Sequence, residues 1–237
     1  MIARADCASI WTRWRICTRN RLALELRVTV PRWLLRFGFH LLYNQMAFAY
    51  DLVAWLVSFG QWAAWRRTVI LFLRDGPILD LAHGTGGLAA DLTAQGMAPV
   101  GLDLSSVMGR LASRRMLRQG MSVRLVRGRA QQLPFPKNAF GNVVATFPAD
   151  FILDPETLES VARVLLPGGR LIIVVLGHLQ GSRSLRRLVT WAYQITGQRD
   201  IPESNAIVRL TRAGFSACWQ DATLEGASAR LLVATRL

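Results

Sequence analysis

The stretch ILDLAHGTGG, residues 78–87, constrains the fold of this chain more than any other feature. An apolar run is followed at once by a glycine-rich turn and then by a helical pattern. Glycine permits the tight turn and lets a ligand come close to the backbone. The helix that follows offers unpaired N–H groups and the positive end of its dipole. The pattern therefore predicts a strand–turn–helix unit that holds an adenosine-containing cofactor, without saying which one.

The same alternation continues through the rest of the chain. Short Val/Ile/Leu-rich runs alternate with helical patterns, which is typical of βαβ units and a parallel sheet. Two further runs flank Glu225-Gly226-Ala227 and predict an antiparallel pair at the sheet edge. The expected strands are 78–81, 98–104, 123–128, 142–147, 170–177, 215–224 and 228–237, and the expected helices are 86–95, 105–118, 154–165 and 182–196. The fold class is thus α/β, a Rossmann-like, doubly wound, mostly parallel seven-stranded sheet with an N-terminal helical cap.

The N-terminal third divides into two parts. Residues 1–30 are basic and nearly free of acids, and we expect a disordered tail. Residues 31–76 carry the cap, and 77–237 the sheet domain. The apolar stretch 37–65 is interrupted at Asn44-Gln45, Asp51 and Gly60-Gln61, so it falls short of the ~20 apolar residues of a membrane span. It predicts two amphipathic helices that cover a core, roof a pocket or lie on a membrane surface.

The chain of 237 residues has a formal net charge of +14, and Lys137 is its only lysine. A surface this rich in arginine attracts anions. The three cysteines, Cys7, Cys17 and Cys218, have no metal-ligand or disulfide spacing, so we expect neither a disulfide framework nor a metal site. A cytoplasmic location follows as the default, with peripheral membrane contact through the N-terminal helices as an open alternative.

Asp103 ends the second expected strand, seventeen residues after Gly86. A carboxylate at that place can accept hydrogen bonds from both hydroxyls of a ribose. It could instead cap the following helix, but Ser105 is the better cap. The glycine turn also fits the dinucleotide pattern G-x-G-x-x-A, so a nicotinamide cofactor stays open on this evidence alone.

Further motifs resemble class I S-adenosylmethionine-dependent methyltransferases over residues 50–237, roughly. ILDLAHGTGGLA is similar to the first motif of that family, GLDLSSVM to the second and RGRAQQLPFP to the third. RVLLPGGRLIIV is similar to its helix–turn–strand 5. Upstream, YDLV (50–53) and SFGQWAAWR (58–66) resemble the ubiquinone/menaquinone C-methyltransferase branch.

The resemblance implies a role for each matching position. Asp80 lies below the methionine moiety of S-adenosylmethionine, near its ammonium group, and Asp103 holds the ribose. The backbone of the turn contacts the cofactor, residues near the second and third motifs flank the adenine, and Phe147 faces the transferring methyl. The expected cofactor residues are Asp80, Ala82, His83, Gly84, Thr85, Gly86, Asp103, Leu104, Met108, Ala130, Gln131 and Phe147.

Two positions depart from the family pattern. Ala82 replaces the first glycine of the turn and fits if its backbone angle is ordinary. Arg129 stands where the third motif often has an acid, and arginine cannot accept a hydrogen bond from the adenine amine. His83 occupies a variable slot, and we expect it to pack and to hydrogen-bond locally rather than to catalyse.

Methyl transfer is an in-line displacement, and a general base helps only if the acceptor loses a proton. Ligands bind at the carboxyl ends of the strands of such sheets, where Asp150 and His178 follow strands. With Tyr50 in the cap, they are the candidate catalytic residues; Asp51 and His40 are weaker candidates in the same segment. The stretch TFPADF (146–151) is apolar. Together with the Trp-, Phe- and Leu-rich cap, it favours a small hydrophobic acceptor.

Three other interpretations compete with this one. Between Leu104 and Ala149 there are seven arginines and one lysine but no acid, which suits an RNA methyltransferase. No recognition module accompanies them, so we do not expect nucleic acid as a partner. A membrane-surface protein with a degenerate cofactor domain is the second alternative. A nicotinamide-dependent reductase is the third, and the Leu-Pro-Gly-Gly turn disfavours it.

Overall fold

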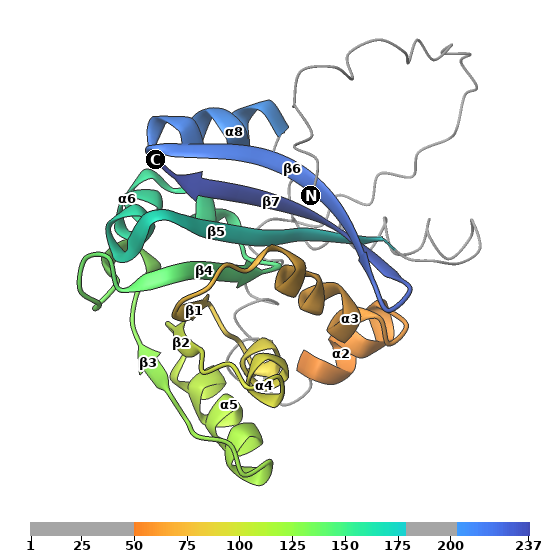
Figure 1. Cartoon of the computed structure of the whole chain (residues 1–237). Coiled ribbons are helices and arrows are strands. Elements are labelled where there is room, and N and C mark those ends of the chain that lie inside the picture. The colour runs from red at the N-terminus through yellow and green to blue at the C-terminus, as the bar shows by residue number, and fades with distance from the viewer. Residues whose placement is uncertain (1–49, 179–202) are drawn as a thin grey trace, which may run out of the picture. The chain divides into compact units, whose positions relative to one another are not determined.

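The computed structural model describes residues 50–178 and 203–237. They form one seven-stranded sheet in the order β3-β2-β1-β4-β5-β7-β6 (Figure 1). The first five strands run parallel, and β7 is antiparallel to both of its neighbours, β5 and β6. This topology confirms the predicted doubly wound, mostly parallel sheet with an antiparallel C-terminal pair.

The strands lie where the sequence predicts them. They are β1 (Ile78–Leu81), β2 (Val100–Asp103), β3 (Leu125–Arg127), β4 (Phe140–Thr146), β5 (Leu165–His178), β6 (Phe215–Leu224) and β7 (Ala227–Arg236). The largest difference is at β5, which begins at Leu165 because this residue already pairs with Phe140 before a register shift. Glu225 and Gly226 both have positive φ, 52° and 76°, and make the tight turn between β6 and β7.

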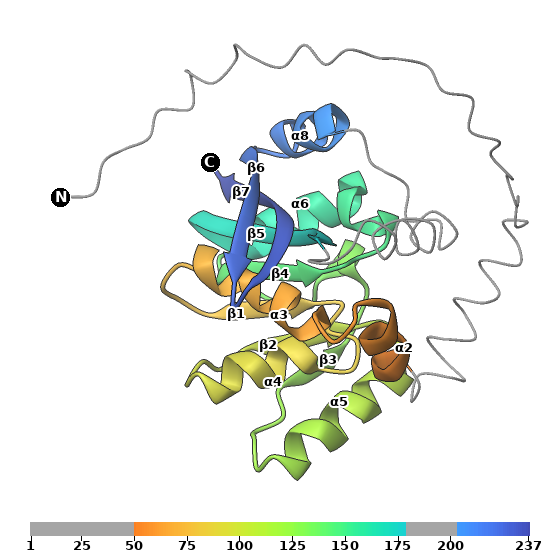
Figure 2. The same ribbon diagram turned by 90° about the vertical axis from the view of Figure 1, so that its right-hand side faces the viewer.

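Helices cover both faces of the sheet (Figures 1 and 2). The described part of the expected cap contains α2 (Tyr50–Val57), α3 (Trp62–Arg67) and the 3₁₀ helix η2 (Thr68–Phe72). The remaining elements are α4 (Gly87–Ala94), α5 (Ser106–Arg118), η3 (Ala130–Gln132), η4 (Asp150–Leu153), α6 (Pro155–Val164) and α8 (Glu203–Arg212). The sequence did not predict α8. Among the described residues, no helix is both long and apolar enough to cross a membrane.

Two apolar cores separate these layers. One packs α6 and α8 against the sheet, with Leu158, Val161 and Leu210 among its buried residues. The other packs α3, η2 and α4 against the opposite face, around Trp65 and Leu92. The sheet is therefore buried on both sides, which explains why its parallel strands read as continuous apolar runs.

The ring of Trp65 is fully buried against β5. A Cβ atom added at Gly177 would lie 2.1 Å from that ring, so only glycine fits at this point of the strand. The approach fixes α3 over the carboxyl-terminal half of β5. It thereby positions the described part of the cap beside the carboxyl ends of the strands.

Several predictions fall outside the described residues. They are the tail 1–30, the first part of the cap up to residue 49 with His40, and the helix expected at 182–196. The division into tail, cap and sheet domain therefore stays a prediction.

Candidate cofactor and acceptor site

The turn between β1 and α4 has three residues in the left-handed region. They are Ala82 (φ 59°), Gly84 (φ 55°) and Gly86 (φ 76°). Gly86 is also required for space, since a Cβ there would lie 2.7 Å from the Cβ of Ala112 in α5. The condition under which alanine would fit this position, an ordinary backbone angle, is therefore not met at Ala82. A left-handed φ brings Cβ too close to the following carbonyl oxygen and costs roughly 1–2 kcal/mol in a non-glycine residue.

Asp103 ties the carboxyl ends of β1 and β2 together. Its Oδ2 accepts a hydrogen bond from the backbone N–H of Gly84 at 2.9 Å, and its Oδ1 accepts one from the N–H of Ser105 at 2.8 Å. Ser105 caps α5, because its hydroxyl accepts from the N–H of Met108 at 3.3 Å. Asp103 is therefore not the helix cap. Its carboxylate lies beside the turn with lone pairs left for further donors.

Asp80 lies beneath the same turn in β1 and is 1% exposed. Neither of its carboxylate oxygens has a hydrogen-bond partner in the structure. Burial and then the charge of Asp103 raise the pKa of Asp80 to about 7, while Arg66 and the Ala89 amide act in the opposite direction. A buried carboxylate without a partner is costly. Arg66, the cation that lowers this pKa, is paired with Asp91 at 2.7 Å, so the Asp80 carboxylate is suited to bind a positively charged ligand group.

His83 is buried in the turn. Its Nδ1 lies 2.8 Å from the carbonyl oxygen of Gly84, and its ring packs where a Cβ at Gly101 would come within 2.9 Å. Burial lowers the pKa of His83, although the Asp103 charge opposes this. The histidine is therefore packed and locally hydrogen-bonded, as its neighbourhood in sequence suggests.

The remaining expected cofactor residues divide by exposure. Thr85 is buried and its hydroxyl lies 3.5 Å from Nη1 of Arg115. Met108 is on the buried face of α5, whereas Leu104, directly after β2, is 60% exposed. Ala130 and Gln131 open η3, directly after the exposed Arg129. These residues follow the carboxyl ends of β1, β2 and β3, where sheets of this type bind ligands.

An aromatic group lies at the neighbouring end of β4. The ring of Phe147 stacks on Trp62 of α3, with centroids 4.2 Å apart and an interplanar angle of 29°. Trp65 meets Phe147 edge-on at 6.4 Å. Phe147 has a φ of 49°, an unusual angle for a bulky residue, and its N–H is held by the carbonyl of Val174 at 2.8 Å. Sequence reasoning missed Trp62, which lies 85 residues before its partner.

The candidate catalytic residues are not all brought together. Asp150 opens η4 three residues after Phe147 and is exposed. The last residue of β5 that pairs with β4 is Val174. His178 lies four residues further along β5, a distance of about 13 Å, and pairs with Ser228 of β7. There its Nε2 lies 3.7 Å from Oδ1 of Asp221 in β6, so it belongs to the C-terminal hairpin. Tyr50 is the first residue of α2, and its side chain is outside the described part.

The fold with this turn is that of the Rossmann-like methyltransferases. Solved structures with the same fold include a methyltransferase from Thermotoga maritima titled a possible histamine N-methyltransferase (TM-score 0.63, 19% identity, covering 84% of this chain and 100% of that one). A methyltransferase from Methanococcus maripaludis titled putative and S-adenosylmethionine-dependent also matches (TM-score 0.60, 17% identity, 80% and 93% covered). At these identities the likeness concerns the fold.

Residues 38–208 match the model of the ubiE/COQ5 methyltransferase family, and the chain belongs to that family. It is 40% identical over 139 residues to the demethylmenaquinone methyltransferase of Thermus thermophilus, covering 56% of this chain and 63% of that protein. It is 32% identical over 175 residues to the ubiquinone/menaquinone biosynthesis C-methyltransferase of Yersinia enterocolitica, covering 70% and 68%. The match to the demethylmenaquinone methyltransferase of Symbiobacterium thermophilum covers 66% of that relative. The chain thus spans about two thirds of the relatives it matches.

Proposed function

We propose that this protein is an S-adenosylmethionine-dependent methyltransferase that methylates a small apolar acceptor, a quinone-type ring. One observation carries the proposal: the buried, unpartnered carboxylate of Asp80 lies beside the backbone-anchored carboxylate of Asp103. S-adenosylmethionine carries both groups that such a pair would bind, an ammonium for Asp80 and a ribose diol for Asp103. The family membership supports the same cofactor.

The Asp80 carboxylate also argues against a dinucleotide. A dinucleotide would place its pyrophosphate at the N-terminus of α4, above the glycine turn. Asp80 is buried directly beneath that turn, and its negative charge would repel the phosphates. The G-x-G-x-x-A pattern is therefore better explained by a cofactor that is cationic at this end.

The acceptor side rests on the aromatic group at the end of β4. Trp62 and Phe147 present stacked rings at the end of β4, which suits a flat apolar ring better than a base in a nucleic acid. The names of the matched relatives point to acceptors of this kind, demethylmenaquinone among them. We propose that these two rings form a wall of the acceptor pocket and that residues 31–76 form its cap.

S-adenosylmethionine held here would supply an electrophilic methyl group, and the electrons of its C–S bond would return to sulfur as the acceptor takes that methyl. Asp80 would hold the ammonium and Asp103 the ribose, which would orient the cofactor relative to the acceptor. The aromatic wall excludes water. The proton lost from the acceptor needs a base only if solvent cannot reach it, and Asp150 is placed best of the three candidates for that role.

We also propose a cytoplasmic location with contact to the membrane surface. Three side chains on α2 support the contact, because Leu52, Trp55 and Leu56 are each more than half exposed. An apolar helix face with a tryptophan suits the membrane interface. Fractionation of cells, before and after a wash with high salt, would test the proposal.

Calorimetric titration tests the cofactor. We expect S-adenosylmethionine and S-adenosylhomocysteine to bind and NAD not to bind. Asp103→Ala should weaken binding by at least ~30-fold, because it removes two charge-assisted hydrogen bonds to the ribose. Asp75→Asn is the control, since Asp75 is an exposed acid before the amino end of β1, opposite the end at which the cofactor is proposed to bind. Binding of NAD instead would contradict the proposal.

Transfer of a labelled methyl group tests the acceptor. A naphthohydroquinone without the ring methyl should be labelled, and transfer RNA should not. Labelling of RNA alone would contradict the acceptor class while leaving the cofactor intact. Cofactor binding without transfer to either acceptor would restrict the proposal to the cofactor site.

A further inference from the structure

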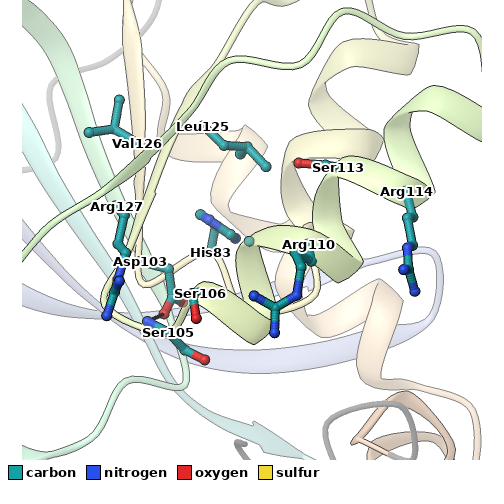
Figure 3. A pocket seen from close by; sticks show the side chains of 11 residues that line it. His83, Asp103, Ser105, Ser106, Arg110, Ser113, Arg114, Leu125, Val126 and Arg127 are labelled. Atoms are coloured by element: carbon teal, nitrogen blue, oxygen red, sulfur yellow. Dashed lines mark hydrogen bonds between the residues drawn. The ribbon is translucent and has the colours of Figure 1, made fainter.

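A second pocket opens between α5 and β3, beside the cofactor site (Figure 3). Its volume is about 460 Å³. Three arginines line it from two elements: Arg110 and Arg114 from α5, and Arg127 from the end of β3. The partly buried Ser106 and Ser113 also line it. The pocket therefore combines positive charge with neutral hydrogen-bond donors.

The three guanidinium groups have no acidic partner among the residues that the structure describes. No described carboxylate lies within ion-pairing distance of Arg110, Arg114 or Arg127. The one acid that lines the pocket is Asp103, whose two oxygens accept the N–H groups of Gly84 and Ser105. Within the described residues, the pocket lining thus carries three positive charges against the one negative charge of Asp103.

The arrangement of the arginines is also unfavourable without a ligand. Arg110 and Arg114 are four residues apart on one face of α5, where like charges repel. Arg127 is held in place because its Nε donates to the carbonyl oxygen of Leu104 at 3.1 Å. Figure 3 shows Arg127 and Arg110 on the two sides of Ser105 and Ser106. An anion between them would relieve the repulsion and would receive donors from both sides.

This pocket borders the proposed cofactor site and shares His83 and Asp103 with it. Of the residues assigned to the adenine, Leu104, Met108, Ala130 and Gln131, none lines it.

We propose that this pocket binds a phosphate-bearing ligand, either a free phosphate ester or the phosphate of a lipid headgroup. Arginine presents planar, paired donors that match phosphate oxygens, and serine hydroxyls add neutral donors. The volume exceeds the ~30 Å³ that a water molecule occupies in the liquid by more than tenfold, so a diphosphate fits. Binding of a phosphate-bearing ligand can be measured without any methyl transfer, so this proposal can be tested separately from the proposed function.

Titration of the full chain with pyrophosphate tests the site. We expect saturable binding, weakened at least ~10-fold in the Arg110→Gln/Arg114→Gln variant. The matched control is Arg118→Gln/Arg212→Gln, which removes the same charge from two exposed arginines outside the pocket. Without ligand, the melting temperature of the first variant should equal or exceed that of the wild type, since the repulsion on α5 is gone. A loss of binding with a preserved melting temperature excludes misfolding.

Two further arms distinguish the sources of the phosphate. The first arm uses vesicles of phosphatidylcholine with phosphatidylglycerol. If the protein binds them only while Arg110 and Arg114 are present, and if pyrophosphate displaces them, the ligand is the lipid headgroup. Binding of pyrophosphate without binding of vesicles would assign a free phosphate ester. Tighter binding of single-stranded RNA, lost in the same variant, would overturn the proposal in favour of nucleic acid. No binding of any probe, or equal binding by both double variants, would also overturn it.

Discussion

Asp80 lies close to Asp103 at the glycine turn, and burial first and then the charge of Asp103 raise the pKa of Asp80. The folded-state value of about 7 exceeds the ordinary value of 3.8, so the folded protein keeps a proton that the unfolded chain releases. The free energy of unfolding of the unliganded protein should therefore fall as pH rises from about 4 to 7. Urea denaturation across this range measures the effect.

Asp80→Asn should remove this pH dependence. The unliganded variant should be more stable than the wild type at pH 8 and no more stable at pH 4, while Asp75→Asn should follow the wild type. The same Asp80→Asn variant should lose most of its affinity for S-adenosylmethionine. A variant that is destabilised at pH 8 would show that Asp80 is already compensated without ligand.

Cofactor binding should release a proton below pH 7. An ammonium group favours the ionised form of Asp80, so affinity should rise as pH increases through about 7 and then level off. Calorimetry in two buffers of different ionisation enthalpy counts the protons released. Asp80→Asn should abolish the release, whereas equal release in the variant would assign it to another group.

Ala82→Gly should stabilise the protein by about 1 kcal/mol, because glycine adopts the left-handed angle of 59° without strain. Ala90→Gly is the control, since Ala90 is inside α4 and glycine there should cost roughly 1 kcal/mol. Thermal melting of both variants gives the comparison. A loss of stability in both would mean that the turn is not strained at Ala82.

Gly177→Ala should destabilise the protein by more than ~3 kcal/mol, because the added methyl would overlap the ring of Trp65. Gly109→Ala, in α5 with no atom within 4 Å of the added Cβ, should be stabilising by about 0.5–1 kcal/mol. Chemical denaturation measures both. The double variant Gly177→Ala/Trp65→Leu should recover part of the loss, which identifies the overlap as its cause.

Trp62→Leu should raise the KM for the acceptor several-fold and leave the Kd for S-adenosylmethionine within about twofold, because its ring lies against Phe147 rather than the turn. Leu117→Ala, which removes an exposed apolar side chain from α5, is the control. A change of cofactor affinity alone would place Trp62 in the cofactor site.

The sheet was predictable because its strands are buried on both faces and bounded by turn residues. β1 is the best example, with four buried residues that end at the glycine turn. Ser105 could be assigned as a cap from its place before a helical pattern, and the structure agrees. These features depend on neighbours along the chain, which the sequence displays directly.

The rest depended on partners far apart in sequence. The strain at Ala82 was missed because a backbone angle is set by the loops that Asp103 holds, not by the residue itself. The spacing of Arg110 and Arg114 puts both on one helix face, but only the sheet register, with Asp103 opposite Arg127, adds the third arginine. His178 was expected near the cofactor edge, whereas the long β5 carries it to the C-terminal hairpin.

The strand order has a consequence for synthesis on the ribosome. β7 follows every other described strand in the chain, yet it lies between β5 and β6. When β6 has left the ribosome, it has no partner in the sheet until β7 emerges. The strand β6 and the helix α8 packed on it therefore cannot join the sheet before β7 is synthesised. A stop codon before β7 would thus remove an interior strand rather than an edge. Such a truncated product would expose β5 along its length and would be a substrate for proteolysis and aggregation.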